Sequence, residues 1–318
     1  GLCHSDVAQL NGHPHVPGEV SPTVPGHEIV GRVHALDDGA DLGVEVGDRV
    51  AVNIVTYGAP YEGNPFGVRC YGYSFGLDER EGLWGGYGEY MSILPGTQLV
   101  RLSDDISAEE LTLFEPLSNM VAWLAKVNLQ AGQTIVIQGP GHMGLTCAAY
   151  AKSLGATVVV TGTDEDALRL EVARGVGADH AIDVTVDDPV EVVQDLTGGF
   201  GASVAVDLAS APSTPSLCFD LVHHLGQVVW AGLKDRAAVP VITDKVVMKS
   251  LTIHGGAGGT PESVAEACRI LNQGDFPTGP LLGEVVGLDE IDRAMEILLR
   301  TAEPDAVRAV LRHASEGV

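Results

Sequence analysis

The stretch TIVIQGPGHMGLTCAAYAKSLGA, residues 134–156, joins an apolar strand-like segment to an apolar helix-like segment through a glycine-rich turn. Its glycines, Gly139, Gly141 and Gly144, follow the pattern GxGxxG. In that pattern Gly139 permits a tight turn, Gly141 lets the backbone approach a pyrophosphate, and Gly144 allows close packing of helix on strand. The N-terminus of the following helix then faces the anion. The stretch predicts a dinucleotide-binding loop, and a tight turn without a ligand is the plainer alternative.

Apolar segments of strand length recur around this loop. They are TIVIQ (134–138), TVVVT (157–161), HAID (180–183), SVAVD (203–207), QVVWA (227–231) and LTIH (251–254). Helix-length segments separate them, and this alternation predicts an α/β fold with a doubly wound parallel sheet covered by helices on both faces. The context favours a bound dinucleotide over an empty turn. Methyltransferases share the general architecture, so only other residues can exclude that class.

The rest of the chain has a different character. Residues 1–117 are rich in Gly, Pro and Val and contain short β-type runs such as 29–36 and 48–55. We therefore expect an irregular β domain over 1–117, a dinucleotide-binding domain over 118–256, and a tail, 257–318, that packs back on the first domain.

Several helix ends can be recognised. Ser107 with Glu110 forms a capping box, and Pro116 is expected to break the helical pattern. Thr260-Pro261 supplies an N-cap followed by a first-turn proline, and Asp289 is expected to cap a further helix.

Composition excludes several classes of protein. Of 318 residues, 43 are acidic and 18 basic, which gives a formal charge of −25 and disfavours nucleic acid and membrane surfaces as partners. No apolar run approaches the roughly 20 residues of a membrane span. The five cysteines are dispersed, which argues against a disulfide framework and favours a reducing compartment, so the protein is expected in the cytoplasm.

The end of the second strand bears on the choice of coenzyme. An acid that binds the ribose hydroxyls usually stands there, whereas this chain has Gly162. Thr161 and Thr163 could donate hydrogen bonds to a 2′-phosphate, but Asp164 and Asp166 oppose one. NAD and NADP both stay open. The residues expected to contact the coenzyme are Gly139, Gly141, His142, Met143, Gly144, Gly162, Thr163, Gly232 and Leu233.

Three fragments carry metal-binding chemistry: Cys3-His4-Ser5-Asp6, Gly26-His27-Glu28 and Phe114-Glu115-Pro116-Leu117. Together they supply the thiolate, imidazole and carboxylate groups of a catalytic Zn²⁺ site with an open position. Each is weak by itself, because a lone cysteine or histidine is more often a structural residue and the chain has 11 histidines.

Taken in order and combined with the dinucleotide fold, these fragments resemble the zinc-dependent medium-chain alcohol dehydrogenase family, especially its polyol and threonine dehydrogenase branch. GDRV (47–50), WGGYGEYM (84–91) and GADHAID (177–183) add to the resemblance. It implies a GroES-like β-rich catalytic domain joined to a Rossmann domain. Family members have β-strands before the cysteine fragment, so we expect a chain beginning at Gly1 to lack N-terminal strands.

The resemblance also implies roles for individual residues. Cys3 and His27 would be zinc ligands, with Glu28 or Glu115 as the third. Asp6 would accept the other ring proton of His27 and fix its tautomer.

Two departures from the family pattern affect these expectations. Relatives often carry a relay histidine where this chain has Ala8, so the proton would leave through Ser5, the coenzyme ribose and water, or through His4. His4 would otherwise contact the pyrophosphate. Only Cys70 stands where many members place four cysteines, so we expect no structural zinc.

The function implied is a zinc-dependent oxidoreductase that transfers hydride between a secondary alcohol or polyol and NAD or NADP. Family habit implies a dimer or tetramer. A zinc-free quinone or enoyl reductase, and a catalytically silent nucleotide-binding protein, are the alternatives. The identity of the alcohol is left open by the sequence.

Overall fold

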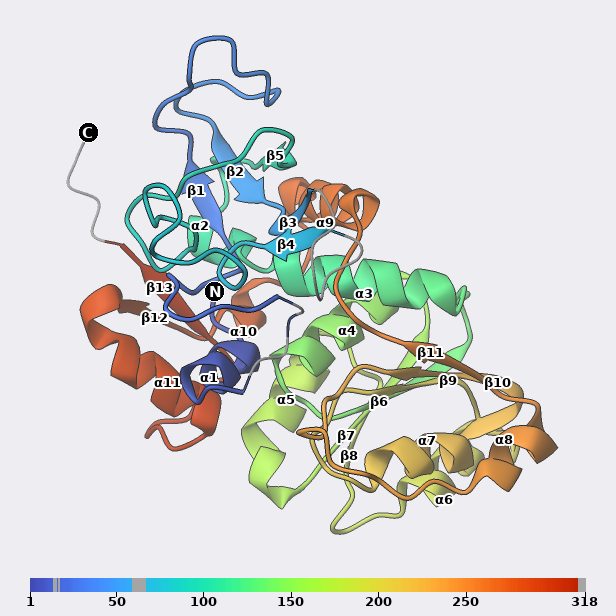
Figure 1. Ribbon diagram of the computed structural model, residues 1–318. Helices are drawn as coiled ribbons and strands as arrows, with labels where there is room; N and C mark the ends of the chain where they lie inside the picture. The colour runs from blue at the N-terminus through green and yellow to red at the C-terminus, as the bar shows by residue number, and fades with distance from the viewer. Residues whose placement is uncertain (14–15, 17, 59–66, 314–318) are drawn as a thin grey trace. The chain divides into compact units, whose positions relative to one another are not determined.

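The computed structural model describes residues 1–13, 16, 18–58 and 67–313. It divides into two compact units (Figure 1). Unit 1 comprises Gly1–Glu115 and Val264–Val318, and unit 2 comprises Pro116–Ser263.

Unit 2 is a six-stranded parallel sheet between helices, in the strand order β11-β10-β9-β6-β7-β8. Its elements are α3 (Phe114–Lys126), which begins in unit 1, β6 (Thr134–Gln138), α4 (His142–Ser153), β7 (Thr157–Gly162), η1 (Asp164–Asp166), α5 (Ala167–Gly175), β8 (His180–Asp183), α6 (Pro189–Leu196), β9 (Ala202–Asp207), α7 (Thr214–Leu221), β10 (Val222–Trp230), α8 (Thr243–Lys249) and β11 (Thr252–Gly255). The chain runs outward from β6 to β8, then returns to β9 on the other side of β6. The strand order therefore reverses between β6 and β9, the position at which open α/β sheets bind ligands.

Two layers of helices cover the sheet of unit 2. α4 and α5 contact each other, while α7 contacts both α6 and α8. The central strands are fully buried, and residues such as Val136, Val159 and Val228 have no exposed surface. The predicted doubly wound parallel sheet is confirmed. Three strands differ from the predicted bounds by a single residue at one or both ends, and β10 differs most: it begins at Val222, and an irregularity between Val222 and Gln227 explains why the apolar pattern is clear only from Gln227 onward.

Unit 1 is built from small β-structures and short helices. Its elements are α1 (His4–Leu10), β1 (Val30–Arg32), β2 (Arg49–Val52), β3 (Val55–Tyr57), β4 (Val68–Cys70), β5 (Leu99–Arg101), α2 (Ala108–Leu111), α9 (Pro261–Gln273), which begins in unit 2, α10 (Gly279–Leu282), β12 (Glu284–Gly287), η2 (Leu288–Glu290), α11 (Ile291–Leu299) and β13 (Ala309–Arg312). The strands form an antiparallel sheet β1-β2-β5, an antiparallel pair β3-β4 and a parallel pair β12-β13.

Two hydrophobic clusters stabilise unit 1. One contains the stacked rings of Tyr71, Phe75 and Trp84, whose centroids lie 5.1–6.4 Å apart. The other joins the start of the chain to its last strands, because the backbone N–H of Leu2 donates to the carbonyl of Ala309 at 3.0 Å and the Leu2 side chain is fully buried.

Two of the expected helix ends are confirmed and two are wrong. Ser107 Oγ accepts from the Glu110 N–H at 3.2 Å, and Thr260 Oγ1 accepts from the Ser263 N–H at 3.2 Å. Pro116 does not interrupt a helix but lies in the first turn of α3, where its missing N–H has no helical partner to lose. Asp289 lies inside η2, and Glu290 precedes α11 instead, since a 3₁₀ turn leads into this helix.

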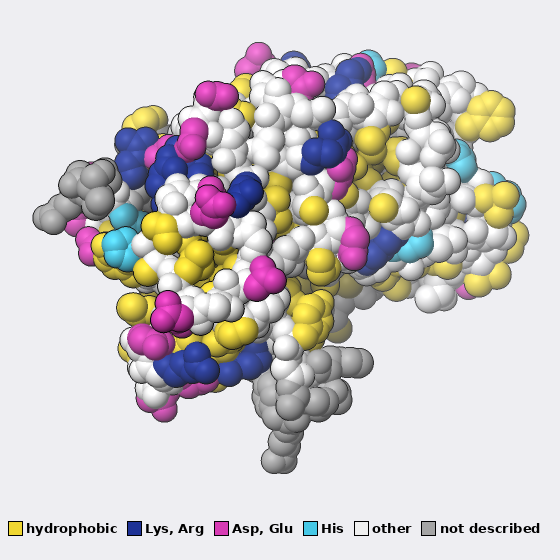
Figure 2. All heavy atoms as spheres, turned by 90° about the horizontal axis from the view of Figure 1, so that it is seen from above, with side chains coloured by type: hydrophobic (Ala, Val, Ile, Leu, Met, Phe, Trp, Pro, Cys, Tyr) yellow, Lys and Arg dark blue, Asp and Glu magenta, His cyan; other side chains and the backbone are white. Residues whose placement is uncertain are grey.

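Charges of both signs are interspersed on the surface. Figure 2 shows one face, on which Asp and Glu side chains are scattered among Lys, Arg and hydrophobic side chains. Exposed pairs such as Arg101–Asp48, at 2.6 Å, contribute little to stability because water screens them. Within the described part of the chain, no helix is both long and apolar enough to cross a membrane.

Gly144 tests the packing of α4 against the loop after β6. A Cβ on Gly144 would lie 1.9 Å from the carbonyl oxygen of Gly139, whereas a Cβ on Gly175, also in a helix, would have nothing within 4 Å. We expect Gly144→Ala to destabilise the protein by about 1–3 kcal/mol through overpacking. Gly175→Ala should be neutral or stabilising by up to ~1 kcal/mol, since alanine favours the helix. Thermal unfolding followed by circular dichroism measures both, and equal melting temperatures for the two variants would contradict this packing.

Candidate active site

The first turn of α1 places Cys3 and Asp6 together. The backbone N–H of Cys3 donates to Asp6 Oδ2 at 2.8 Å, and Asp6 is buried. This bond closes the N-terminal turn of the helix. As a result the Cys3 side chain stands at the start of α1 with a carboxylate directly beside it.

The backbone around His27 requires a glycine. Gly26 has a φ of +98°, and a Cβ there would lie 2.5 Å from the ring of Tyr87 and 2.9 Å from the Tyr87 nitrogen. The two residues that follow, His27 and Glu28, are 5% and 3% exposed. The Gly-His-Glu fragment is thus held tightly against the segment 84–91.

A hydrogen-bond network surrounds the imidazole of His27. Its Nδ1 lies 3.2 Å from Asp6 Oδ1 and 2.9 Å from the Tyr73 hydroxyl, which in turn lies 2.9 Å from Ser5 Oγ. Tyr87 donates to Asp6 Oδ2 at 2.8 Å. Since Nδ1 is engaged by Asp6 and Tyr73, Nε2 is the ring nitrogen available to a metal.

The charges of this network shift several pKa values. Burial alone would lower the pKa of His27, but the Asp6 carboxylate beside Nδ1 raises it well above its usual value. Burial, reinforced by the Asp6 carboxylate, raises the pKa of both Tyr73 and Tyr87. Both phenols therefore keep their protons at neutral pH and can donate hydrogen bonds.

One group of possible metal ligands occurs among the described residues: Cys3, His27 and Glu28, whose ligand atoms all lie within 4.8 Å of one another. A thiolate, an imidazole and a carboxylate fit zinc, which accepts sulfur, nitrogen and oxygen ligands in a tetrahedral site. Three protein ligands leave a fourth position, as in catalytic rather than structural zinc sites. Glu115, the other predicted carboxylate, is not part of this group.

Glu28 also has a second partner. Arg308 donates to Glu28 Oε2 through Nη2, and both side chains are fully buried. Arg308 lies just before β13, in the apolar run AVRAVLR. A buried carboxylate needs such a partner, because desolvation of an unpaired charge is costly.

Sequence reasoning missed Tyr73, Tyr87 and Arg308. Tyr87 lies in the segment 84–91, which the family resemblance had marked without giving the tyrosine a role. Arg308 had a weak signal, a single charge within an apolar run. Nothing in the sequence around Tyr73 indicates that its hydroxyl reaches His27, 46 positions away in the chain.

The glycine-rich loop of unit 2 has the expected local geometry. Gly139 has a φ of +98°, which a residue with a side chain rarely adopts. A Cβ on Gly141 would have nothing within 4 Å, so the loop is open at the N-terminus of α4. His142 and Met143 are the first residues of α4 and are half-buried, while Gly232 and Leu233 follow β10. These positions lie at the carboxyl ends of β6 and β10, the edge where dinucleotides bind in such sheets.

The end of β7 excludes a side chain at position 162. A Cβ on Gly162 would lie 2.9 Å from Pro140 and 3.0 Å from the Cβ of Asp166. Asp166 Oδ2 accepts hydrogen bonds from the Thr163 N–H at 2.9 Å and from the Thr163 hydroxyl at 3.1 Å. The Thr163 hydroxyl is therefore committed to a carboxylate.

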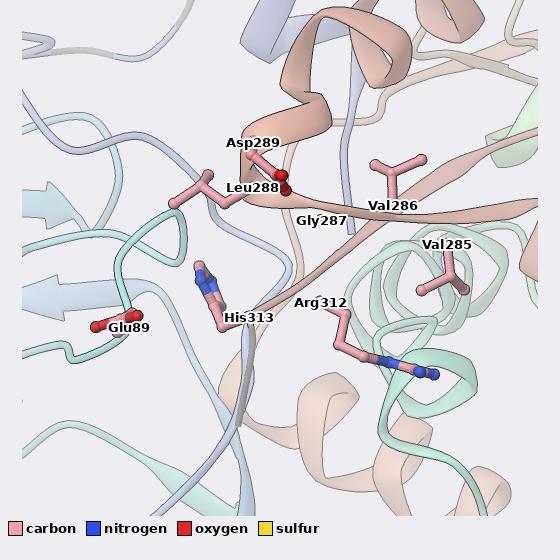
Figure 3. Close-up of a pocket in the computed structure, with 8 residues that line it drawn as sticks. All are labelled: Glu89, Val285, Val286, Gly287, Leu288, Asp289, Arg312 and His313. Carbon is pink, nitrogen blue, oxygen red and sulfur yellow. The ribbon is translucent and has the colours of Figure 1, made fainter. Parts of the chain in front are cut away.

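A separate pocket in unit 1 has no comparable group of converging ligand side chains among its described residues. It has a volume of about 390 Å³ and is lined by Glu89, Val285, Val286, Gly287, Leu288, Asp289, Arg312 and His313. Figure 3 shows the side chains of Arg312 and His313 extending in different directions. Arg312 pairs with Glu109, and Nε2 of His313 lies 3.0 Å from the Gly86 carbonyl oxygen, so these polar groups do not converge on a common point.

The chain is similar to several known proteins over most of its length. Residues 1–104 match the alcohol dehydrogenase GroES-like domain, and residues 143–273 match the zinc-binding dehydrogenase family. A protein of Mycobacterium tuberculosis, named a probable alcohol dehydrogenase, is 36% identical over 308 residues, covering 91% of this chain and 82% of the relative. A sorbitol dehydrogenase of Halalkalibacterium halodurans is 30% identical over 299 residues, covering 92% of this chain and 84% of the relative. The crystal structure of an alcohol dehydrogenase from Thermotoga maritima gives a TM-score of 0.87 at 23% identity and covers 98% of this chain and 89% of that one.

A parallel sheet with a dinucleotide loop, and a second unit with a sulfur, nitrogen and oxygen ligand group, define a metal-dependent oxidoreductase. The chain belongs to the zinc-dependent medium-chain alcohol dehydrogenase family. Its function is hydride transfer between an alcohol or polyol and a nicotinamide cofactor, and its small-molecule partners are alcohols. The relatives named above are dehydrogenases of alcohols and polyols, which favours this function over a zinc-free reductase or a silent nucleotide-binding protein.

Asp6 is the residue on which the ligand geometry depends most. Asp6→Asn removes the charge that orients Nδ1 of His27, and loss of such outer partners costs about 10–100-fold in metal affinity. We expect a fall of that size, measured by competition for zinc with a colorimetric chelator. The control is Tyr87→Phe, which removes one hydrogen bond to Asp6 and leaves its charge. Equal zinc affinity in Asp6→Asn and the unmodified protein would contradict this role.

Proposed function

We propose that unit 1 binds a single catalytic zinc ion through Cys3, His27 and Glu28, with Glu115 as the alternative carboxylate, and that no structural zinc is present. The observation that carries this proposal is the ligand group of Cys3, His27 and Glu28 within 4.8 Å. When bound, zinc supplies Lewis-acid polarisation of the alcohol oxygen and lowers its pKa. Cys70, the cysteine in the segment where relatives place structural ligands, is free and buried, and burial raises its pKa to about 11, which disfavours the thiolate that zinc requires.

Ser5 is proposed to bind the alcohol hydroxyl, with Tyr73 as its support. When Nδ1 of His27 carries a proton, that proton is shared between Asp6 and the Tyr73 oxygen, so the Tyr73 O–H donates to Ser5. A serine hydroxyl has two lone pairs and one hydrogen. Tyr73 occupies one lone pair, leaving the other to accept the proton of the alcohol and the hydrogen to pass onward. His4 is exposed and Ala8 is buried and apolar, so of these two only His4 can exchange a proton with solvent.

The substrate class is proposed to be a secondary alcohol or polyol. Support comes from the relative named sorbitol dehydrogenase, which the chain matches over 84% of its length. A spectrophotometric screen of polyols, hydroxy amino acids and simple secondary alcohols identifies the preferred member. Reduction of nicotinamide by none of them would contradict the proposal.

NAD is proposed as the preferred coenzyme. The Thr163 hydroxyl already donates to Asp166, and Asp164 and Glu165 are exposed beside it. A 2′-phosphate would meet carboxylates here, and like charges in proximity repel. Gly162 has no room for the usual ribose-binding acid, so discrimination against NADP is assigned to this acidic turn.

The protein is proposed to act in the cytoplasm as a dimer or tetramer. None of the five cysteines forms a disulfide, in keeping with a reducing compartment. β11 is an edge strand, and the neighbouring helix α8 exposes Val247 and Met248 to 73% and 76%. An open strand edge beside exposed apolar side chains suits association with a second copy.

Replacement of Cys3 tests the metal site. We expect Cys3→Ala to lose bound zinc and turnover while still binding NADH, because the coenzyme loop lies in unit 2. Cys268→Ala, a buried cysteine outside the ligand group, is the control and should keep both zinc and turnover. Zinc is measured by elemental analysis and NADH by fluorescence. Full activity in Cys3→Ala would refute the ligand assignment.

Replacement of Asp164 tests the coenzyme preference. We expect kcat/KM for NAD to exceed that for NADP, and Asp164→Arg to shift the ratio toward NADP by on the order of tenfold, since an arginine accommodates the 2′-phosphate. Asp195→Arg makes the same charge change on α6 and should leave the ratio unchanged. A preference for NADP in the unmodified protein would overturn the proposal.

A further inference from the structure

A buried ion pair lies at the carboxyl edge of the sheet in unit 2. Asp207 is the last residue of β9, and Lys234 follows β10. Lys234 Nζ is 3.0 Å from Oδ2 and 3.2 Å from Oδ1 of Asp207, and the two side chains are only 11% and 1% exposed. The pair therefore connects the loops after two adjacent strands beneath the surface of the unit.

Both members of the pair also hold the backbone of Ala209. Lys234 Nζ donates to the Ala209 carbonyl, while the Ala209 N–H donates to Asp207 Oδ1 at 3.3 Å. The Leu208 N–H donates to the Gln138 carbonyl of β6 at 2.9 Å. The backbone of Leu208 and Ala209 is thus tied to β6 through the Leu208 N–H and to Lys234 through the Ala209 carbonyl.

The Leu208–Ala209 segment lies between two glycines, each of which approaches its backbone closely. A Cβ on Gly139 would lie 2.9 Å from the Ala209 nitrogen, and a Cβ on Gly232 would lie 2.3 Å from the Ala209 oxygen. Gly139 is the first glycine of the coenzyme loop. Any displacement of the Leu208–Ala209 backbone would therefore be transmitted to Gly139, in the loop proposed to bind the coenzyme, at the point where the strand order reverses.

Stability alone does not account for a pair of this kind. The attraction between two buried charges is largely offset by the free energy that it costs to remove them from water. Apolar residues of similar volume often stabilise a protein as well or better. Burial raises the pKa of Asp207 in spite of the neighbouring ammonium, which shows that the desolvation is substantial. The pair does fix the position of the loop after β9, because both of its members bind the backbone of Ala209.

We infer that Lys234 is a positioning residue for the coenzyme: it holds the backbone of Leu208 and Ala209 between Gly139 and Gly232 and so fixes the carboxyl edge of the sheet for the nicotinamide dinucleotide. Lys234 acts through Ala209 and Asp207. The inference concerns coenzyme binding in unit 2 and is independent of which residues bind zinc in unit 1.

The experiment compares Lys234→Met with the double variant Asp207→Asn/Lys234→Met in the zinc-loaded enzyme. In Lys234→Met, we expect the Kd for NADH and the KM for the oxidised coenzyme to rise on the order of tenfold, a change equivalent to about 1.4 kcal/mol. Zinc content and the KM for the alcohol should stay unchanged. In the double variant no charge is left unpaired, so the melting temperature should recover, while Kd stays raised because Ala209 still lacks its donor.

Two further variants complete the test. Lys234→Arg keeps a charged donor and should restore part of the affinity for NADH. Lys245→Met breaks a more exposed pair with Asp220, 2.7 Å long, and is the control that should leave Kd unchanged. If Lys234→Met fails to fold, the double variant and Lys234→Arg still measure the effect. The inference is overturned if Kd recovers together with the melting temperature in the double variant, or if Lys234→Met binds NADH as the unmodified enzyme does.

Discussion

The carboxylate of Asp6 is the contact on which the site in unit 1 depends. It accepts from the backbone of Cys3, lies against Nδ1 of His27 and accepts from the hydroxyl of Tyr87. Three segments distant in sequence are therefore held by one buried anion. Cys3 and Tyr87 bind one carboxylate oxygen and His27 the other, so a shift of the cysteine backbone would disturb the contact with the histidine. Such rigidity is what a metal site with defined geometry requires.

Backbone contacts play the corresponding part in unit 2. Gly139, Gly144 and Gly232 each stand where a Cβ would collide with a main-chain atom. The loops after β6, β9 and β10 are consequently packed main chain against main chain. Side chains add further contacts to these turns: Asp166 binds the turn after β7, and Lys234 binds the turn after β9. Close approach of main chain to main chain at these loops leaves backbone groups available, which suits a pyrophosphate.

The fold of unit 2 was predictable because its information is local. Strands buried on both faces appear as continuous apolar runs, and glycine turns mark their ends; the segments at 134–138 and 180–183 agree with β6 and β8 residue for residue. Failures occurred where a neighbouring turn decides the outcome. Asp289 looked like a cap, but the helix is entered through η2, and the start of β10 lies in a polar segment without strand periodicity.

The candidate site was predictable in its ligand types but not in its surroundings. The fragments containing Cys3, His27 and Glu28 could be recognised, because these ligand residues lie in short sequence motifs that resemble those of the family. The partners that orient them could not. Tyr73 contacts His27 across 46 positions, and Arg308 contacts Glu28 across 280 positions. Contacts between residues so far apart in the chain produce no periodic pattern in the sequence.

The backbone hydrogen bond between Leu2 and Ala309 has a consequence for folding during synthesis. The cysteine, histidine and glutamate of the site are translated before unit 2, whereas the Arg308 guanidinium that pairs with the glutamate and the strand that contacts Leu2 are translated after it. The parallel sheet of unit 2 lies within a single continuous stretch, so it can form before those later residues of unit 1 have been synthesised. Unit 2 can therefore complete its fold before unit 1, even though residues 1–115 of unit 1 are synthesised ahead of it.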